Sequence, residues 1–274
     1  MLKQRLLTAA VLVALIITAV FLFSTLWFAV LLAVFLVIGA WEWARLMKSD
    51  RNATLPVLPG VLVAVLIPLW FFQHETVLLL VVLGAAAIGW CVALSSLPRS
   101  NTLRALHSYG NSVRFLVGLF LLAPPWLALI HLHATPHYGP WYVLFLFGLV
   151  SVADSAAYFT GRAWGKNKLA PDISPGKTWE GVYGAMVATG VYGAMCGAWF
   201  ELRGMKLAAF VTLCIVTVMF SIVGDLFESL IKRQAGAKDS GSVLPGHGGV
   251  LDRIDSLTAA APIFTLGLWL MEGV

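Results

Sequence analysis

Long apolar runs separated by short polar connections constrain the fold of this 274-residue chain more than any other feature. A helix that crosses the hydrocarbon core of a membrane needs about 20 mostly apolar residues. Nine segments of roughly that length occur, at residues 6–23, 26–43, 56–73, 76–95, 113–132, 140–160, 182–200, 207–227 and 256–272. The sequence therefore predicts an all-α, polytopic integral membrane helix bundle with about nine transmembrane helices.

The composition excludes the main alternatives to a membrane bundle. Only 11% of the residues are charged and 60% are hydrophobic, whereas an average soluble domain carries about 25% charged residues. Intrinsic disorder requires the opposite composition, with low hydrophobicity and high charge. The net charge of +5 accompanies 16 Phe and 11 Trp, so we expect the lipid bilayer, and no nucleic acid, as the partner.

The basic side chains predict the orientation of the bundle. With the N-terminus in the cytoplasm, 16 of the 18 Lys and Arg residues fall on the cytoplasmic side, and Arg203 and Lys206 fall outside. Such a bias follows the positive-inside rule, so we expect an N-in, C-out protein of the bacterial inner (cytoplasmic) membrane. Segment 6–23 is expected to be a retained helix rather than a signal peptide, because its apolar run is longer than a typical h-region.

Ionisable residues concentrate in two segments of the C-terminal half. Residues 154–180 and 225–255 together hold 16 of the 31 charged residues. We therefore divide the chain into residues 1–112, with about four hydrophobic spans and a basic connecting segment, and residues 113–274. The second part is expected to be a catalytic membrane domain with two cytoplasmic polar segments, 154–181 and 225–256.

The second polar segment begins with a polar helical face. Asp225, Glu228, Ser229 and Lys232 recur at positions i, i+3, i+4 and i+7, which share one side of a helix. Ionisable groups inside a membrane helix are costly and by default mark a functional site. The alternative is a structural ion pair of Lys232 with Asp225 or Glu228 that steadies the bundle.

The residues that follow favour a site for a metal ion and phosphate groups. Asp252 and Asp255 lie three residues apart and would face the same way at a helix start, where with Asp225 they could hold Mg²⁺. Glycines in the preceding turn allow backbone N–H groups to approach an anion, and His247 lies between two of them. The basic side chains suited to phosphate oxygens are Lys232, Arg233, Lys238 and Arg253.

The first polar segment combines a carboxylate late in a span, Asp154, with a basic loop that contains glycine. Gly176-Lys177-Thr178 resembles the end of a Walker A loop, but Pro171 stands at the first glycine position of that pattern. A P-loop NTPase is therefore not expected. The alternative for the lysines is an ordinary basic loop attracted to anionic lipid.

Both polar segments resemble those of a known family. Residues 229–255 read S-L-I-K-R-x4-K-D-S-G-x3-P-G-H-G-G-x2-D-R-I-D, which resembles the signature of the phosphatidate cytidylyltransferases, or CDP-diacylglycerol synthases. Residues 154–181 read D-S-x-A-Y-F-x-G-R-x-x-G-K-x-K-L-x-P-x-I-S-P-G-K-T-W-E-G, which resembles the other cytoplasmic segment of that family. The resemblance covers most of the C-terminal half.

The resemblance implies an activity and a set of site residues. It implies the transfer of a cytidylyl group from CTP to phosphatidate, with Mg²⁺ and K⁺ bound by Asp225 and Asp252, and it suggests a homodimer. We expect metal ligands at Asp225, Asp252 and Asp255. Catalytic roles are expected for Lys232, Arg233, Lys238, Asp239, His247 and Arg253. Substrate-binding roles are expected for Ser174, Lys177, Thr178, Ser229, Gly246, Gly248 and Gly249.

Two other functions fit a charged membrane bundle. A polytopic transporter would place broken helices and polar residues in paired halves near the membrane midplane, whereas the charges here gather on one side of the C-terminal half. Another lipid phosphotransferase, of the CDP-alcohol type, would carry a D-G-x-x-A-R motif, which is absent. Both alternatives are therefore less favoured than cytidylyl transfer.

Overall fold

The computed structural model describes residues 2–47, 57–96, 111–244, 246 and 248–272. Within these residues the chain forms nine helices, and each overlaps one of the predicted apolar runs. Their bounds are α1 (Leu2–Leu22), α2 (Thr25–Leu46), α3 (Val57–Phe71), α4 (Thr76–Ser96), α6 (Asn111–Ala134), α7 (Gly139–Trp164), α8 (Trp179–Trp199), α9 (Gly204–Gln234) and α10 (Leu251–Glu272).

The predicted class, a membrane bundle of helices, is confirmed. In the described part of the chain, six helices are long and apolar enough to cross a membrane, namely α2, α4, α6, α7, α9 and α10. Helices α1 and α3 contribute shorter apolar stretches, at Ala10–Leu22 and Val57–Phe71. The number of crossings, the N-in orientation and the division at residue 112 stay predictions.

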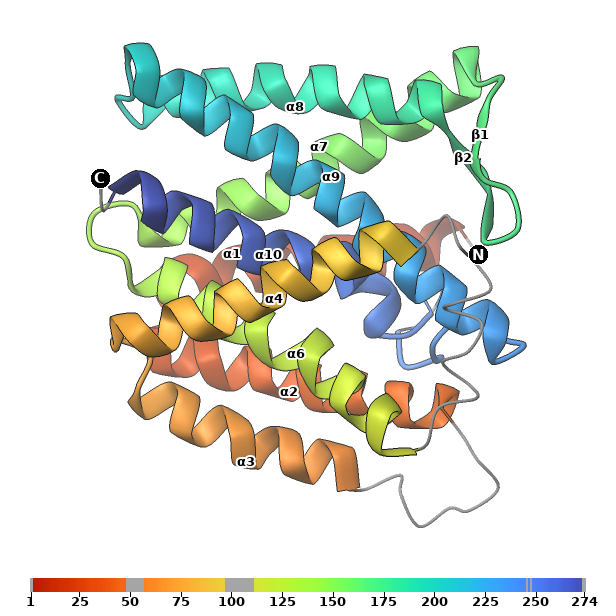
Figure 1. Ribbon diagram of the computed structural model, residues 1–274, viewed down its shortest axis with the longest axis horizontal. Coiled ribbons are helices and arrows are strands. Elements are labelled where there is room, and N and C mark those ends of the chain that lie inside the picture. The colour runs from red at the N-terminus through yellow and green to blue at the C-terminus, as the bar shows by residue number, and fades with distance from the viewer. Residues whose placement is uncertain (1, 48–56, 97–110, 245, 247, 273–274) are drawn as a thin grey trace.

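The helices run back and forth between two ends of the molecule. In Figure 1 the N-terminus lies at the end that also carries the loop after α9, and the C-terminus lies at the opposite end. Two short β-strands after α7 lie at the same end as the N-terminus. This end, with the strands and with residues 235–250 between α9 and α10, is called the polar end below. It brings together the two predicted polar segments.

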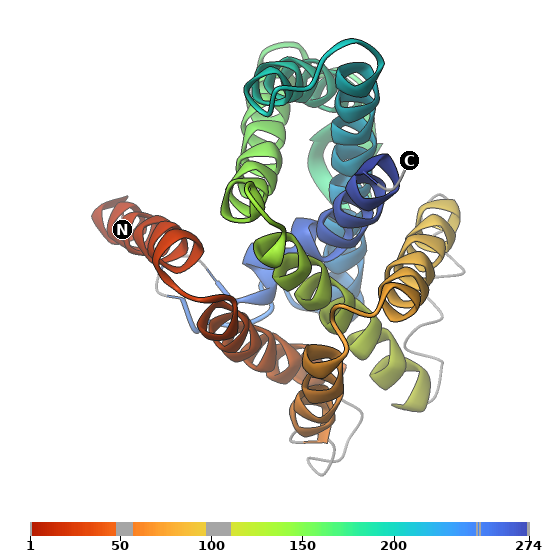
Figure 2. The same ribbon diagram turned by 90° about the vertical axis from the view of Figure 1, so that its left-hand side faces the viewer.

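Helix α10 occupies the centre of the bundle. It packs against α9, α6, α4, α7 and α2, whereas α1 lies at the outside against α2 and α7 (Figure 2). Ala259, Ala260 and Ala261 of α10 are completely buried, and such small side chains let neighbouring membrane helices approach closely. Trp90 of α4 donates a hydrogen bond to the carbonyl oxygen of Thr258 at 3.2 Å, which ties α4 to the same helix.

Helix α9 is longer at its polar end than the apolar run predicts. The predicted span ends at residue 227, but the helix continues to Gln234. Hydropathy alone ends the span early because charged residues follow Asp225, although these residues are still helical. The polar face predicted from the i, i+3, i+4 and i+7 spacing therefore exists as a helical face.

A β-hairpin over the polar end of α9 was not predicted. Strands β1 (Lys168–Ala170) and β2 (Ser174–Thr178) pair in antiparallel fashion, with Lys168 opposite Thr178. Ile173, between the strands, packs on Leu226 and Leu230 of α9. The segment contains two prolines, which are unfavourable in most strands, so its sequence gave no strand signal. The packing holds the hairpin against α9.

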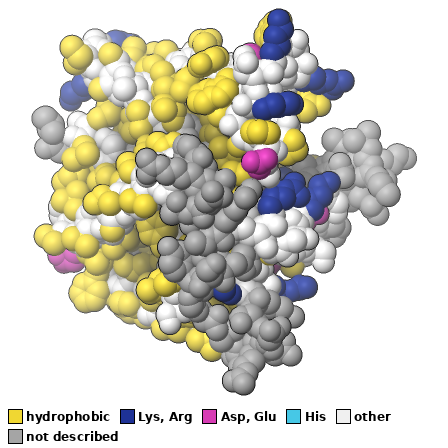
Figure 3. Space-filling model, turned by 45° about the vertical axis from the view of Figure 1, so that its right-hand side comes forward, with side chains coloured by type: hydrophobic (Ala, Val, Ile, Leu, Met, Phe, Trp, Pro, Cys, Tyr) yellow, Lys and Arg dark blue, Asp and Glu magenta, His cyan; other side chains and the backbone are white. Residues whose placement is uncertain are grey.

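The surface of the molecule is also divided into a polar end and an apolar flank. Figure 3 shows Lys and Arg side chains gathered toward the polar end, while apolar side chains cover much of the neighbouring flank. Exposed apolar residues on the helices include Val81, Ile88 and Val187. An apolar flank of this kind is suited to contact with lipid chains rather than with water.

Candidate active site

Acidic side chains from three helices form a cluster at the polar end. Asp225 interacts electrostatically with Asp154 and with Asp255, and Glu228 interacts with Asp255 and Asp252. The cationic side chains that interact with this cluster are Lys177, Lys232 and Arg253. Among the described residues, five carboxylates therefore face three cations, and this excess of acidic groups favours the binding of additional positive charge.

Asp225 is held by residues from both polar segments. One carboxylate oxygen lies 2.5 Å from Lys177 Nζ, and the other accepts a hydrogen bond from Ser229 Oγ at 3.2 Å. The hairpin therefore delivers Lys177 to α9, across 48 positions of sequence. The structure brings together these three residues, of which one was expected to bind metal and two to bind substrate.

Lys232 lies between two carboxylates. Its Nζ is 2.7 Å from Asp252 Oδ1 and 3.2 Å from Glu228 Oε1. The structural ion pair considered from the sequence therefore exists for Glu228, whereas Asp225 pairs with Lys177 instead. Glu228 and Lys232 are only 6% and 9% exposed, and the ion pair of Lys232 with Asp252 links α9 to α10 inside the protein.

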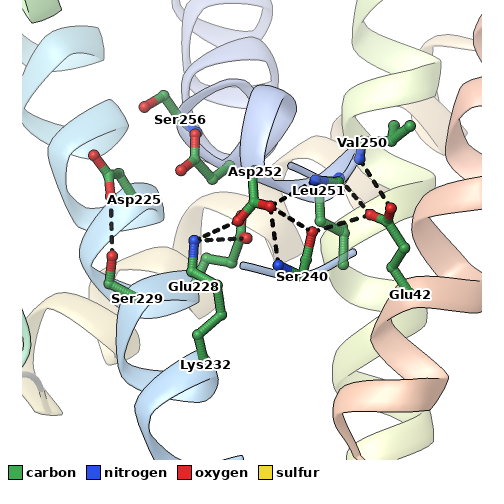
Figure 4. A network of polar contacts seen from close by, with 12 residues as sticks. Glu42, Asp225, Glu228, Ser229, Lys232, Ser240, Val250, Leu251, Asp252 and Ser256 are labelled. Atoms are coloured by element: carbon green, nitrogen blue, oxygen red, sulfur yellow. Dashed lines mark hydrogen bonds and ion pairs between the residues drawn. The ribbon is translucent and has the colours of Figure 1, made fainter. Parts of the chain in front are cut away.

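The loop between α9 and α10 fixes the second oxygen of Asp252. Oδ2 accepts hydrogen bonds from the backbone N–H groups of Ser240 and Gly249, at 2.9 and 2.8 Å, and lies 3.0 Å from Ser240 Oγ (Figure 4). Gly248 has a φ of +83°, a conformation that glycine adopts without strain. The carboxylate is thus oriented by backbone groups, with Oδ1 directed at Lys232.

Other predicted site residues lie around Asp225, Lys232 and Asp252, and their contacts hold neighbouring segments in place. Arg233 Nε donates to the carbonyl oxygen of Ile173 at 3.4 Å and so holds the tip of the hairpin. Thr178 is buried, and its hydroxyl accepts a hydrogen bond from Gly181 N as the N-cap of α8. Asp255 Oδ1 accepts from Ser256 N at 2.6 Å. Their proposed roles in binding metal and substrate stay predictions.

The remaining predicted residues that the structure describes lie on the loop after α9, at the start of α10 and on strand β2. Lys238, Asp239 and Gly246 are exposed on the loop after α9, and Arg253 is exposed at the start of α10. Ser174 begins strand β2. His247 and Pro245 lie outside the described residues, so the role predicted for His247 has no structural description.

Glu180 anchors the base of the hairpin ahead of the predicted span 182–200. Its carboxylate accepts hydrogen bonds from Asn167 N, at 3.2 Å to each oxygen, and from Asn167 Nδ2 at 2.8 Å. Backbone N–H groups, foremost its own, stabilise the ionised form and hold the pKa of Glu180 below its ordinary value. The ionised side chain therefore ties the loop before β1 to the start of α8.

One buried acidic residue of the polar end was missed entirely. Glu42 on α2 is 1% exposed and contacts the loop that orients Asp252. The rule that singled out Asp154, a lone carboxylate in an apolar span, would also have found Glu42. Its partners were not predictable, because the apolar pattern of α2 does not reveal which distant segment packs on it.

The donor set fits Mg²⁺ only with help from the substrate. Among the described residues, no three His, Cys, Asp or Glu side chains are arranged to hold a metal ion by themselves. Mg²⁺ in phosphate-transfer sites is commonly bound by one or two carboxylates, with water and substrate phosphates as the other ligands. The excess of carboxylates over cations among the described residues of the cluster fits such a site, for which Asp225 and Asp252 were predicted as ligands.

An apolar cleft leads to the carboxylate cluster. It has a volume of about 340 Å³ and lies between α1, α2, α6, α7 and the start of α10. Its apolar wall includes Ile16, Leu32 and Phe147, and its polar end includes Asp154 and Asp252. A cleft that is apolar along its length and charged at one end fits an amphipathic ligand with an acyl chain and a polar head.

Comparisons with known proteins agree on one family. A sequence profile described as the Cytidylyltransferase family matches residues 3–271. The chain is 38% identical to the phosphatidate cytidylyltransferase of Haemophilus influenzae, over 97% of this chain and 98% of that protein. It is 40% identical to the protein of the same name from Pseudomonas aeruginosa, over 98% of this chain and 97% of that protein. A Brucella suis protein with this name is 44% identical over 54% of each chain.

Proposed function

Because the chain belongs to the phosphatidate cytidylyltransferases of the Cytidylyltransferase family, we propose that it transfers a cytidylyl group from CTP to phosphatidate. The products are CDP-diacylglycerol, used in phospholipid biosynthesis, and pyrophosphate. The observation that supports this most is the carboxylate–lysine cluster at the charged end of an apolar cleft. A soluble nucleotide and a membrane lipid would meet at that point.

The chemistry requires positioning and neutralisation of charge more than acid–base catalysis. A phosphate oxygen of phosphatidate attacks the α-phosphorus of CTP, a new P–O bond forms, and the bond to the pyrophosphate leaving group breaks. The attacking phosphate monoester is already anionic at neutral pH, since its second pKa is about 6, so no strong base is needed. Lys177 and Lys232, which form ion pairs with carboxylates of the cluster, would contact the substrate phosphates.

Asp225 and Asp252 are the proposed ligands of Mg²⁺, with K⁺ as a second ion. When bound there, Mg²⁺ would neutralise charge on the transferring phosphoryl group and on the pyrophosphate. Asp252 is suited to this role because its Oδ2 is fixed by two backbone N–H groups while Oδ1 faces the cluster. Asp255 is a supporting carboxylate.

The lipid substrate is proposed to lie in the apolar cleft. Its phosphate would lie near Asp154, Asp252 and Arg253, and its acyl chains would follow the wall of α1 and α2 into the bilayer. CTP would approach from the other side of the cluster, where Lys177 of the hairpin covers Asp225. The excess of Lys and Arg predicted on this side supports a cytoplasmic active site.

A comparison of two lipid acceptors, phosphatidate and diacylglycerol, tests this proposal. Purified protein in vesicles receives CTP, Mg²⁺ and either phosphatidate or diacylglycerol, and pyrophosphate is measured. We expect pyrophosphate only with phosphatidate, because diacylglycerol carries no phosphate nucleophile. Release of pyrophosphate at the same rate with diacylglycerol, or without any lipid, would contradict the proposal.

A further inference from the structure

Glu42 is an acidic residue inside an apolar helix, and no ion pair with a described Lys or Arg side chain is found for it. It lies between two tryptophans on α2 and is 1% exposed. Among the described residues, the ion pairs of the protein involve other acidic side chains. A carboxylate in such a place is costly unless hydrogen bonds satisfy it, so its partners indicate what it is for.

Among the described residues, the hydrogen-bond donors to Glu42 lie in the loop that leads into α10 and at the first residue of that helix. Oε1 accepts from Val250 N at 3.1 Å, and Oε2 accepts from Leu251 N at 2.9 Å and from Ser240 Oγ at 3.0 Å. Leu251 begins α10, and the first N–H groups of a helix have no partner within the helix. Glu42 therefore caps the N-terminus of α10, although it precedes Leu251 by 209 positions. A negative charge is favourable at that end of the helix dipole.

Ser240 connects Glu42 to Asp252. Its hydroxyl lies 3.0 Å from a carboxylate oxygen of each residue, and a hydroxyl has a single hydrogen to donate. The backbone N–H of the same serine holds Asp252 Oδ2. Figure 4 shows the resulting chain of contacts, from Glu42 on α2 through Ser240 to Asp252 and Lys232.

The backbone of the loop between α9 and α10 packs closely against the Glu42 carboxylate. A Cβ atom on Gly249 would lie 2.6 Å from both Glu42 oxygens, and one on Gly241 would also collide with the Glu42 side chain. Helix α2 is in turn fixed to α6, because Trp43 Nε1 donates to the carbonyl oxygen of Arg114 at 3.1 Å. Helix α2 thus offers the loop a fixed support.

We propose that Glu42 is a positioning residue of the active site. By holding the loop between α9 and α10 against α2, it keeps the Asp252 carboxylate in the orientation that faces Lys232 and the acidic cluster. This inference rests on the proposed function, since Asp252 is the residue through which Glu42 acts. It also gives the N-terminal part of the chain a defined part in the reaction.

The main test compares Glu42→Gln with Glu75→Gln, a matched change of an exposed residue at the other end of the bundle. Glutamine keeps the size of Glu42 but turns one acceptor into a donor that faces N–H groups. Loss of a residue that orients a metal ligand typically costs 10- to 100-fold in activity or metal affinity. We expect Glu42→Gln to lower kcat by about that factor and to raise the Mg²⁺ concentration for half-maximal activity, with the KM for CTP little changed.

A purely structural role would give a different result. It would reduce the amount of active protein and hence the apparent kcat, while the Mg²⁺ requirement of the remaining enzyme stayed at the wild-type value. An unchanged Mg²⁺ requirement in folded Glu42→Gln protein would overturn the inference. If Glu42→Gln does not fold, the Ser240→Ala variant tests the inference instead. It removes the hydroxyl that joins Glu42 to Asp252 and leaves the hydrogen bond from Ser240 N to Asp252 in place. We then expect a smaller shift in the Mg²⁺ requirement, and no shift would overturn the inference.

Backbone hydrogen exchange separates this inference from the proposed function. Exchange of a peptide covering residues 248–252 should be faster in Glu42→Gln than in wild type and unchanged in Glu75→Gln. This comparison needs no substrate, so it remains decisive if wild-type protein shows no cytidylyl transfer and the proposed function fails. Equal exchange in Glu42→Gln and wild type would overturn the positioning role even in an active enzyme.

Discussion

At the scale of single residues, two aspartates differ in how they are held. The hydrogen bonds found for Asp225 come from the side chains of Lys177 and Ser229, whereas Asp252 also accepts two from backbone N–H groups of the loop before α10. Backbone donors cannot move away without unfolding the loop. In the proposed Mg²⁺ site, Asp252 would therefore be the more rigidly held carboxylate, and Asp225 could exchange Lys177 for a cation or a substrate contact.

Asparagine at either position should remove activity and leave the fold in place. In Asp225→Asn and Asp252→Asn the side chain keeps its size but loses the charge that would bind a cation. We expect cytidylyl transfer to fall by at least about 10²-fold, as for loss of a central electrostatic contact, in protein that still purifies as a single species. The matched control is Asp172→Asn in the exposed hairpin turn, which should keep wild-type activity. Near-normal transfer by folded Asp225→Asn would show that the metal assignment is wrong.

The sequence predicted which side chains gather at the polar end better than it predicted their contacts. Spacing on one helix face selected Asp225 and Lys232, because i, i+4 and i+7 positions are geometrically fixed. The pairing of Lys177 with Asp225 joins residues 48 positions apart, and no local pattern specifies such a contact. The partners of Glu42 were unpredictable for the same reason, since they follow it by about 200 positions.

At the scale of elements, the hairpin and α1 border the two sides of the cluster. The hairpin packs on α9 through Ile173 and brings Lys177 to Asp225. Helix α1 supplies one wall of the apolar cleft. The apolar runs predicted the helices, but the hairpin depends on tertiary contacts with α9 and Glu180, which local propensity does not reveal. The hairpin should therefore influence the binding of CTP, and α1 should influence the binding of phosphatidate.

A bulky residue in the cleft should interfere with the lipid and spare the nucleotide. Ser151 lines the cleft one turn before Asp154 on α7, and its hydroxyl donates to the carbonyl oxygen of Phe147. We expect Ser151→Trp to raise the KM for phosphatidate by about tenfold, equivalent to about 1.4 kcal/mol of lost binding, with the KM for CTP unchanged. Kinetics with each substrate varied in turn would measure both constants.

The chain offers a matched control for this substitution. Ser95 on α4 is also exposed on an apolar helix, and its hydroxyl also donates to a carbonyl oxygen of the preceding turn. Because it does not line the cleft, Ser95→Trp should leave both KM values unchanged. Equal effects of the two tryptophans, or a larger effect of Ser151→Trp on CTP than on phosphatidate, would contradict the placement of the lipid.

At the scale of the whole molecule, the alternation of the helices sorts the polar groups to one end. The two polar segments and the N-terminus lie at that end, and the C-terminus lies at the other (Figure 1). A periodic apolar pattern predicts how many helices form but not which of them pack together. The central place of α10 became apparent only from its contacts with α9, α6 and α4.

The orientation of the bundle is testable by labelling with a membrane-impermeant maleimide. Single cysteines are introduced by Glu201→Cys, in the turn before α9, or by Ser242→Cys, in the loop after α9, with the native cysteines at positions 91, 196 and 214 replaced. In intact spheroplasts we expect labelling at position 201 only, and at position 242 after permeabilisation. The reverse pattern would contradict a cytoplasmic active site.

The position of a radioactive label tests the central claim, cytidylyl transfer to phosphatidate, most directly. Purified protein in phosphatidate-containing vesicles is incubated with Mg²⁺ and CTP labelled with ³²P at either the α- or the γ-phosphate. The account predicts that the α-label enters the lipid fraction, that the γ-label leaves as soluble pyrophosphate, and that removal of Mg²⁺ with EDTA stops both. Transfer of the γ-label to lipid, or no labelled lipid from folded protein with Mg²⁺ present, would contradict it.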